Sequence, residues 1–179
     1  MKKMKCSHPY ACWAARVIEE YVKTGKAPYP DLEDSSLPQE LFERRAGCFV
    51  SIHKLDGSLR GCIGTILPTQ KNLAMEIREN AISAATRDPR FPPVAPGELE
   101  ELEVSVDVLG DLEQVSSLDE LDPKVYGIVV ASGYRRGVLL PDLPGVDTVE
   151  EQIRIASLKA GIRPEEISKI YRFKVERYH

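Results

Sequence analysis

The chain has 179 residues and a formal net charge of −4 at pH 7, with 42% hydrophobic and 29% charged residues. This length suits one domain with a sizeable core, or two closely packed subdomains. The acidic balance argues against a general nucleic-acid-binding protein that relies on backbone phosphates. No segment is apolar over the length of a membrane span, and the basic first residues lack the apolar run of a signal peptide. We therefore expect a cytoplasmic protein that makes no use of a membrane.

Two helices are predicted before the first strand. Residues 10–24 carry apolar side chains at helical spacing, and Gly25 is a natural stop. A shorter helix is predicted near Ser36, which would lie near its cap, with Pro38 in its first turn.

The chain contains four cysteines, Cys6, Cys12, Cys48 and Cys62. Their spacing matches no recognisable disulfide or zinc-ribbon pattern, which predicts reduced thiols. Cys6, His8 and Cys12 could supply three zinc ligands, but this segment has no fourth obvious ligand. We therefore predict no metal site.

A hairpin is predicted over about residues 47–67, because Asp56-Gly57 lies between two strand-like runs and both positions of a tight turn need positive φ. A symmetric two-residue turn would place Lys54 opposite Leu59. The same register would pair His53 with Arg60, Ile52 with Gly61, and Ser51 with Cys62.

This register predicts two different faces for the hairpin, because side chains alternate along a strand. One face is apolar and contains Val50, Ile52, Leu59 and Ile63. The other face contains Ser51, His53, Arg60 and Cys62, and it is a candidate chemical site.

The rest of the chain repeats similar patterns. Residues 72–87 predict a long helix, residues 88–93 a stiff proline-rich turn, and residues 102–108 a strand with one buried face. A polar loop or a frayed helix is predicted at residues 111–122. A second hairpin follows over residues 127–140, then a helix that begins at an Asp147–Glu150 capping box and ends at Ala160, and a last strand at residues 171–176.

Residues 47–108 and 127–176 thus share one order of elements: hairpin, proline, helix and strand. This order predicts an internal duplication, with the helix at residues 10–24 outside it. The predicted fold is α+β, with two hairpin–helix–strand repeats that form one largely antiparallel, barrel-like sheet and pack their helices outside.

Three segments carry a resemblance to a known family: GCFV at residues 47–50, LRGCIGT at residues 59–65, and AATRDPRFPP at residues 84–93. Together they resemble the AMMECR family, of which LRGCIGT is the hallmark. Residues 126–128, 137–143 and 150–162 resemble its stand-alone microbial branch, AmmeMemoRadiSam system protein A. The match covers nearly the whole chain, so we expect one AMMECR-like domain over residues 1–179.

The resemblance implies an α+β fold of two helix-bearing, β-rich repeats in one barrel-like sheet. It implies no established activity and no particular cofactor. The name of the microbial branch implies a Memo-like protein and a radical S-adenosylmethionine protein as partners.

Cys62 has two interpretations. It is either a nucleophilic or cofactor-binding thiolate, with its pKa lowered by Arg60 and with His53 as base or orienting group, or a small buried apolar residue. Gly61 and Gly64 either leave room for a ligand or mark a bulge and close helix packing.

The segment after the long helix also has two interpretations. Arg87 and Arg90 could hold an anionic substrate while Asp88 orients one of them. Alternatively, Asp88 caps the turn and pairs with Arg90 to hold the loop.

We therefore predict an enzyme or enzyme component that handles a small anionic substrate. The alternative is a non-catalytic adaptor or ligand-binding module, with nucleic-acid processing as a weaker third function. The predicted catalytic residues are Cys62, Arg60, His53 and Asp88, and the predicted substrate-binding residues are Ser51, Gly61, Gly64, Thr65, Arg87 and Arg90.

Overall fold

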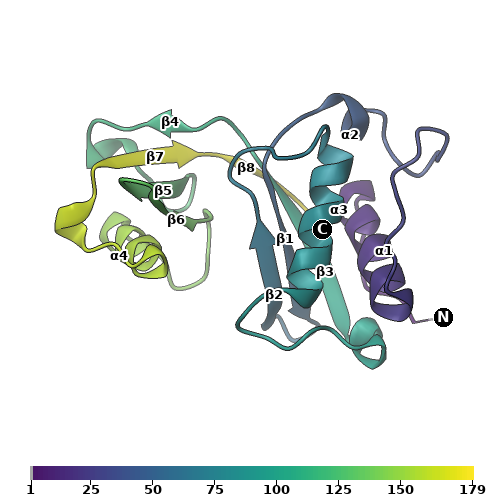
Figure 1. Ribbon diagram of the computed structural model, residues 1–179. Helices are drawn as coiled ribbons and strands as arrows, with labels where there is room; N and C mark the ends of the chain where they lie inside the picture. Colours follow the sequence, from purple (N-terminus) through teal and green to yellow (C-terminus); the bar gives the residue numbers. More distant parts are fainter. Residues whose placement is uncertain (1) are drawn as a thin grey trace. The chain divides into compact units, whose positions relative to one another are not determined.

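The computed structural model describes residues 2–179, which divide into two compact units (Figure 1). Unit 1 contains the chain up to Val108 together with Glu176–His179, and unit 2 is Leu109–Val175. Two four-stranded sheets are present in the described residues, in the orders β2-β1-β3-β8 and β4-β7-β5-β6. No closed barrel is found among them, so the barrel-like arrangement is not confirmed, and the strands form two sheets rather than the predicted one. The α+β class and the antiparallel hairpins are confirmed.

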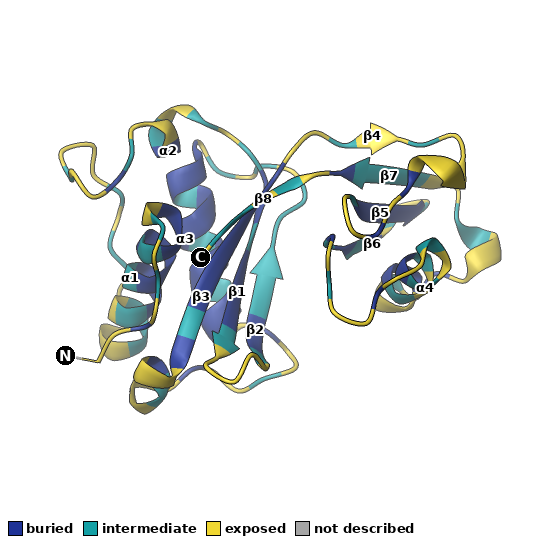
Figure 2. Ribbon diagram, turned by 180° about the vertical axis from the view of Figure 1, so that it is seen from behind, coloured by how far each residue is buried: buried dark blue, intermediate teal, exposed yellow. Residues whose placement is uncertain are grey.

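Unit 1 is a sheet with helices packed on it. Helix α3 contacts β1 and β2, and α1 packs against α3. Figure 2 shows that α3, β1 and β3 consist largely of buried residues. The elements of this unit are α1 (Pro9–Thr24), α2 (Glu40–Glu43), β1 (Cys48–Lys54), β2 (Leu59–Gly64), α3 (Leu73–Thr86), the 3-10 helix η1 (Pro96–Glu101), β3 (Leu102–Leu109) and β8 (Val175–Tyr178).

The two long helices of unit 1 confirm the prediction from apolar spacing. Helix α1 is capped by His8, whose Nδ1 accepts from the Tyr10 backbone N–H, and it ends at Gly25 with φ of 75°. The side chain of Asn72 caps α3 by accepting from the Met75 N–H. The shorter helix α2 begins at Glu40, later than predicted, and has no side-chain cap.

The hairpin turn differs from the symmetric two-residue turn that Asp56-Gly57 predicted. The Lys54 N–H donates to the Ser58 carbonyl at 2.8 Å, and Gly57 has φ of 90°, which is typical of a three-residue loop with a left-handed third position. His53 therefore lies opposite Leu59, and the register shifts between Ile52 and His53. The predicted His53–Arg60 and Lys54–Leu59 pairs are wrong.

The other part of the predicted register is confirmed. Ser51 lies opposite Cys62, and Ile52 lies opposite Gly61. The shift makes Arg60 the extra residue of a β-bulge, and it moves Leu59 to the face of His53. Because the shift occurs on the turn side of Gly61, Cys62 keeps its predicted face.

Unit 2 has its own sheet and a separate hydrophobic core. Its helix is capped by Thr148, whose hydroxyl accepts from the Glu151 N–H, so the prediction of Asp147 as the cap is wrong. The elements are β4 (Glu113–Gln114), the 3-10 helix η2 (Leu118–Glu120), β5 (Gly127–Ser132), β6 (Arg135–Leu139), α4 (Val149–Ala160), the 3-10 helix η3 (Pro164–Glu166) and β7 (Lys169–Phe173).

The last predicted strand, residues 171–176, is in fact two strands. β7 ends at Phe173 and β8 begins at Val175, and each belongs to a different sheet. The final segment therefore contributes one strand to each sheet instead of forming a single strand.

The two units repeat one order of elements. In both, a hairpin is followed by a helix and then by a strand that pairs with the first strand of the hairpin, as β3 pairs with β1 and β7 pairs with β5. The division into repeat-like halves at residues 47–108 and 127–176 stays a prediction about the origin of this arrangement.

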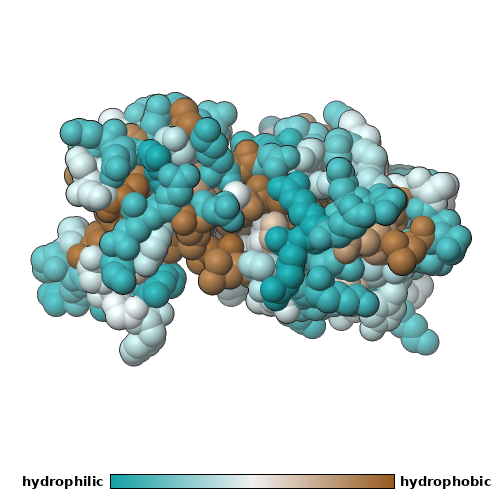
Figure 3. Space-filling model, turned by 90° about the horizontal axis from the view of Figure 1, so that it is seen from above, coloured by the Kyte–Doolittle hydropathy of each residue, from teal (hydrophilic) through white to brown (hydrophobic). Residues whose placement is uncertain are grey.

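Among residues 2–179, none of the helices has the length and apolar character to cross a bilayer. The face in Figure 3 is mainly hydrophilic, with apolar side chains at several places. Among the large apolar side chains of the described residues, Tyr29, Leu32 and Tyr134 are the most exposed.

Candidate functional site

The thiol of Cys62 lies on the sheet face that the hairpin register predicted. The Ser51 hydroxyl donates a hydrogen bond to Cys62 Sγ at 3.2 Å from the neighbouring strand. Cys62 is half-buried, whereas Cys48 is fully buried, and burial raises the pKa of the Cys48 thiol to about 12. Of these two thiols, Cys62 is the one that a reagent or substrate can reach.

A row of three small polar side chains crosses the sheet at this point. Ser51 lies between Cys62 on β2 and Ser105 on β3. Opposite residues of antiparallel neighbours share a face, so the three side chains point the same way. Asp107 follows on that face and forms a bidentate pair with Arg177, at 2.7 and 3.1 Å. Sequence reasoning missed these β3 residues, although the alternation Glu103, Ser105, Asp107 could have identified a polar face.

Asp88 and Arg90 hold the outer edge of β2. Asp88 Oδ2 accepts from the Cys62 backbone N–H at 3.0 Å, and Arg90 Nη2 contacts the Cys62 carbonyl at 3.5 Å. Arg90 also donates to Asp88 through Nε at 3.0 Å and Nη2 at 2.8 Å. The segment therefore satisfies backbone groups that an edge strand would otherwise expose.

The charges of this pair are closely linked. Hydrogen bonding from Arg90, above all, lowers the pKa of the buried Asp88 carboxyl far below its ordinary value. The pKa of Arg90 is raised, first by its hydrogen bond to Asp88, with a smaller contribution from the charge of Cys62. Arg90 is thus close enough to Cys62 to interact with it electrostatically.

Arg60 is engaged by a different carboxylate. Its Nε and Nη2 donate to the two oxygens of Glu98 at 2.8 and 3.1 Å, and its side chain is only 7% exposed. The pKa of Glu98 is lowered, mainly by these hydrogen bonds. The catalytic role of Arg60 stays a prediction, but its charge is balanced by Glu98.

Both glycines of the hallmark segment are required for close packing. A Cβ on Gly61 would lie 2.3 Å from the Ala84 carbonyl oxygen of α3. A Cβ on Gly64 would lie 2.3 Å from the ring of Phe49. These contacts favour the packing interpretation of the glycines over the ligand-space interpretation.

Thr65 is tied to a buried carboxylate that sequence reasoning missed. Its hydroxyl donates to Glu76 at 3.1 Å and accepts from Asn80 Nδ2 at 3.1 Å. Glu76, 1% exposed, also accepts from the backbone N–H groups of Thr69 and Gln70. Glu76 and Asn80 lie one turn apart on α3, and two polar residues on the apolar face could have indicated this anchor.

The remaining predicted residues lie around this group. His53 is half-buried on β1, two residues from Ser51 and therefore on the same face. Arg87 is the C-cap of α3 and is exposed. The structure thus brings Ser51, Cys62, Asp88 and Arg90 into direct contact.

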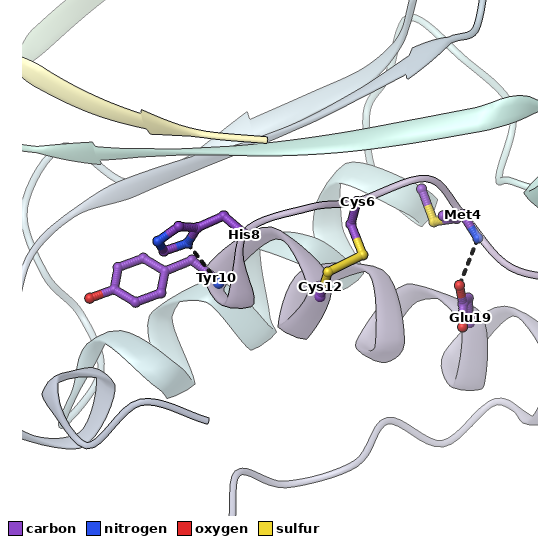
Figure 4. Close-up of a disulfide and its surroundings, with 6 residues drawn as sticks. All are labelled: Met4, Cys6, His8, Tyr10, Cys12 and Glu19. Atoms are coloured by element: carbon purple, nitrogen blue, oxygen red, sulfur yellow. Dashed lines mark hydrogen bonds between the residues drawn. A yellow bond between two sulfur atoms is a disulfide. The ribbon is translucent and has the colours of Figure 1, made fainter. Parts of the chain in front are cut away.

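The prediction that Cys6 and Cys12 are reduced is wrong, because they form a disulfide (Figure 4). Their Cα atoms are 5.2 Å apart, within the usual range for a disulfide. The first turn of α1 brings Cys12 close to Cys6, a proximity that sequence spacing does not reveal. Among residues 2–179, no group of His, Cys, Asp and Glu side chains has an arrangement suited to a metal ion.

Comparison with known proteins identifies the family. The model of the family described as AMMECR1 matches residues 11–178. The chain belongs to the AMMECR1 family. A protein of Thermotoga maritima is 64% identical over 173 residues, which cover 96% of this chain and 97% of that protein. Protein CA_C1420 of Clostridium acetobutylicum is 45% identical over 95% of this chain, which spans only 36% of that longer protein.

A solved structure has the same fold. The crystal structure of the uncharacterised protein PH0010 from Pyrococcus horikoshii matches with a TM-score of 0.86 at 33% identity, covering 97% of this chain and 92% of that one. These relatives are named without an activity. Membership of the AMMECR1 family therefore identifies the relationship and the fold, but no reaction.

Proposed function

We propose that this AMMECR1-family protein is an enzyme or enzyme component in which Cys62 acts as nucleophile or tether for a small anionic substrate. The observation that carries the proposal is the hydrogen bond from the Ser51 hydroxyl to Cys62 Sγ, on a half-buried thiol. A donor to sulfur favours the thiolate, and the thiolate is the nucleophilic form of cysteine.

The neighbouring arginines differ in what they can offer a substrate. Arg60 and Arg90 are each paired with a carboxylate, so they contribute positioned N–H donors more than net positive charge. The Arg90 side chain is 53% exposed and can donate outward while it holds Asp88. Arg87 is exposed at the end of α3, next to Asp88 in the sequence. An anionic group near Cys62 would thus meet Arg90.

The resemblance to the stand-alone microbial branch supports a Memo-like protein and a radical S-adenosylmethionine protein as partners of this reaction. In this arrangement the partners supply the chemistry that a single thiol lacks, and Cys62 holds or transfers the substrate.

The test is the alkylation rate of Cys62 against pH, read by peptide mass spectrometry. Cys48 is a buried internal control, and Cys6 and Cys12 do not compete while their disulfide is intact. We expect Cys62 to label in the folded protein with a midpoint below that of an ordinary thiol, about 8.5. Ser51→Ala should slow labelling at neutral pH, whereas Ser105→Ala, one strand further along the row, should not.

If folded Cys62 does not label, or if Ser51→Ala leaves the rate and midpoint unchanged, the thiol is not activated and the proposal fails.

A second function, a non-catalytic adaptor or ligand-binding module, is favoured by a specific observation. Four residues of the hallmark segment make internal contacts: Arg60, Gly61, Gly64 and Thr65. Such contacts are expected if the segment shapes a binding surface and takes no part in a reaction. The adaptor predicts that Cys62→Ala retains partner binding, whereas the enzyme predicts loss of turnover with folding intact. Arg60→Ala needs a folding check, because it leaves Glu98 without its bidentate partner.

A further inference from the structure

The disulfide between Cys6 and Cys12 lines a cavity that the proposed Cys62 chemistry does not use. The cavity has a volume of about 320 Å³, and both cysteines belong to its wall. Both are half-buried. Figure 4 shows the disulfide joining the N-terminal segment to the first turns of α1, flanked by the Met4–Glu19 and His8–Tyr10 hydrogen bonds. A small molecule in this cavity would therefore lie against a disulfide.

We propose that the Cys6–Cys12 disulfide is a thiol–disulfide exchange site that takes a small anionic thiol in this cavity. The cavity wall contains two cationic side chains, Lys3 and Arg16, and one carboxylate, Glu19. Glu19 is half-buried and accepts from the Met4 backbone N–H at 2.7 Å, whereas Lys3 is exposed. Lys3 is therefore the charged group that an incoming reagent meets first, and it favours a negatively charged reagent.

The two cations contribute differently. Arg16 lies over the ring of Trp13, which also lines the wall, and Arg16 Nη2 pairs with Asp34 at 2.8 Å. Arg16 therefore adds little net charge to the wall, and its Nε is buried without a hydrogen-bond partner. Lys3 is exposed and supplies the charge that attracts an anion.

The position of Cys12 in α1 determines which sulfur is the leaving group. Cys12 is the fourth residue of α1, and the first turn contains no acidic side chain to offset the positive end of the helix dipole. A thiolate on Cys12 is therefore stabilised, and a stabilised thiolate is the better leaving group. Attack consequently falls on Cys6 Sγ.

The exchange balances in two steps. The incoming thiolate forms a bond to Cys6 Sγ, the Cys6–Cys12 bond breaks, and its electron pair remains on Cys12 Sγ. A second small thiolate then attacks the sulfur of the bound thiol, which releases a small-molecule disulfide and leaves the Cys6 thiolate. Water protonates the two cysteines according to their pKa values. The protein disulfide is reduced, and two small thiols are oxidised.

Backbone contacts keep the N-terminal segment in place after exchange. The Lys5 N–H donates to the Leu102 carbonyl at 2.9 Å, and the Val104 N–H donates to the Lys5 carbonyl at 3.2 Å. Exchange therefore changes the chemistry of the cavity wall without requiring the unit to unfold, and the folded protein can be tested directly.

The experiment incubates the folded protein with 2-mercaptoethanesulfonate or with cysteamine, quenches with acid and maps mixed disulfides by mass spectrometry. Rates are corrected for the thiolate fraction of each reagent. We expect a mixed disulfide on Cys6 rather than Cys12, and faster exchange with the anionic thiol by about two- to fivefold. Lys3→Glu should remove this preference. Lys71→Glu, an exposed lysine outside the cavity wall, should retain it.

Two outcomes would overturn the proposal. If the disulfide is reduced only as fast as the protein unfolds, measured in parallel by circular dichroism, it is a structural crosslink. If both thiols exchange equally and Lys3→Glu has no effect, the cavity does not select an anionic thiol. Neither readout depends on Cys62, so failure here leaves the proposed function unaffected.

Discussion

Asp88 links a loop to an edge strand through a single carboxylate. It accepts hydrogen bonds from the Cys62 N–H and from Arg90, and its side chain is 2% exposed. Its pKa is lower in the folded protein than its ordinary value of 3.8. The stability that Asp88 contributes is therefore fully present above the unfolded pKa and is lost as pH falls toward the folded pKa.

We predict that the free energy of unfolding of the native protein falls between about pH 5 and about pH 2, and that Asp88→Asn weakens this dependence. At neutral pH the same variant should be less stable, because Arg90 loses its charged partner. Urea unfolding across the pH series measures both effects. The control is Asp31→Asn, an exposed carboxylate that accepts from the Glu33 backbone N–H. An identical pH dependence in Asp88→Asn and the native protein would contradict this account.

At the residue scale, the predicted Ser51–Cys62 pair is confirmed although the predicted turn is wrong, because the extra residue Arg60 in the β-bulge offsets the extra residue of the turn. The partner of Arg60, by contrast, could not be predicted. Its partner Glu98 lies 38 residues further along the chain, and no local pattern selects it. Glu76 was missed for a similar reason, since its partners come from a loop whose path depends on tertiary structure.

One glycine contact recurs between a hairpin and a helix in each unit. A Cβ on Gly61 would meet the Ala84 carbonyl of α3 at 2.3 Å, and a Cβ on Gly137 would meet the Ala156 carbonyl of α4 at 2.0 Å. Each glycine lies in the second strand of its hairpin, so each lets a helix backbone approach the sheet.

We predict that Gly61→Ala and Gly137→Ala each destabilise the protein by about 1–3 kcal/mol, because a backbone carbonyl cannot move aside as a flexible side chain can. Gly97→Ala is the matched control, since a Cβ added there would meet nothing within 4 Å and the φ of Gly97 is not positive. It should change the free energy of unfolding by less than about 0.5 kcal/mol. Equal effects at all three positions, measured in urea, would show that the contacts are not responsible.

At the element scale, periodicity predicted the long helices and the hairpins, since these patterns are local. It could not predict the three-residue turn, because Asp-Gly suits several hairpin turns and the choice depends on strand twist. It also could not predict that β7 ends and β8 begins around Lys174, because residues 169–178 contain no proline or glycine that would indicate a break between strands.

At the scale of the whole molecule, the chain passes from unit 1 into unit 2 after β3 and returns to unit 1 in β8. The returning residues make contacts with distant parts of unit 1. The His179 carbonyl accepts from the Ser7 and His8 N–H groups, Glu176 pairs with Arg44 at 2.7 Å, and Arg177 pairs with the buried Asp107. Unit 1 is thus completed by residues that follow unit 2 in sequence. A barrel was predicted because the repeated order of elements does not reveal to which sheet the last strand belongs.

We predict that deletion of Glu176–His179 destabilises unit 1 by at least about 3 kcal/mol, because Asp107 is left buried without its arginine. Hydrogen exchange measured by mass spectrometry should show lost protection at Ser7 and His8 and in β1 and β3. Strands β5 and β6 should keep their protection, since unit 2 retains β4 and β7 and its separate core.

Two variants distinguish the contribution of the Arg177–Asp107 ion pair to stability from that of strand β8 itself. Arg177→Ala should reproduce part of the loss in unit 1, and the double variant Arg177→Ala with Asp107→Asn should recover stability, because the unpaired buried charge is gone. Equal loss of protection in both units after the deletion would show that they unfold as one cooperative body. The result therefore decides whether the two sheets, which share one order of elements, are also separate units of stability.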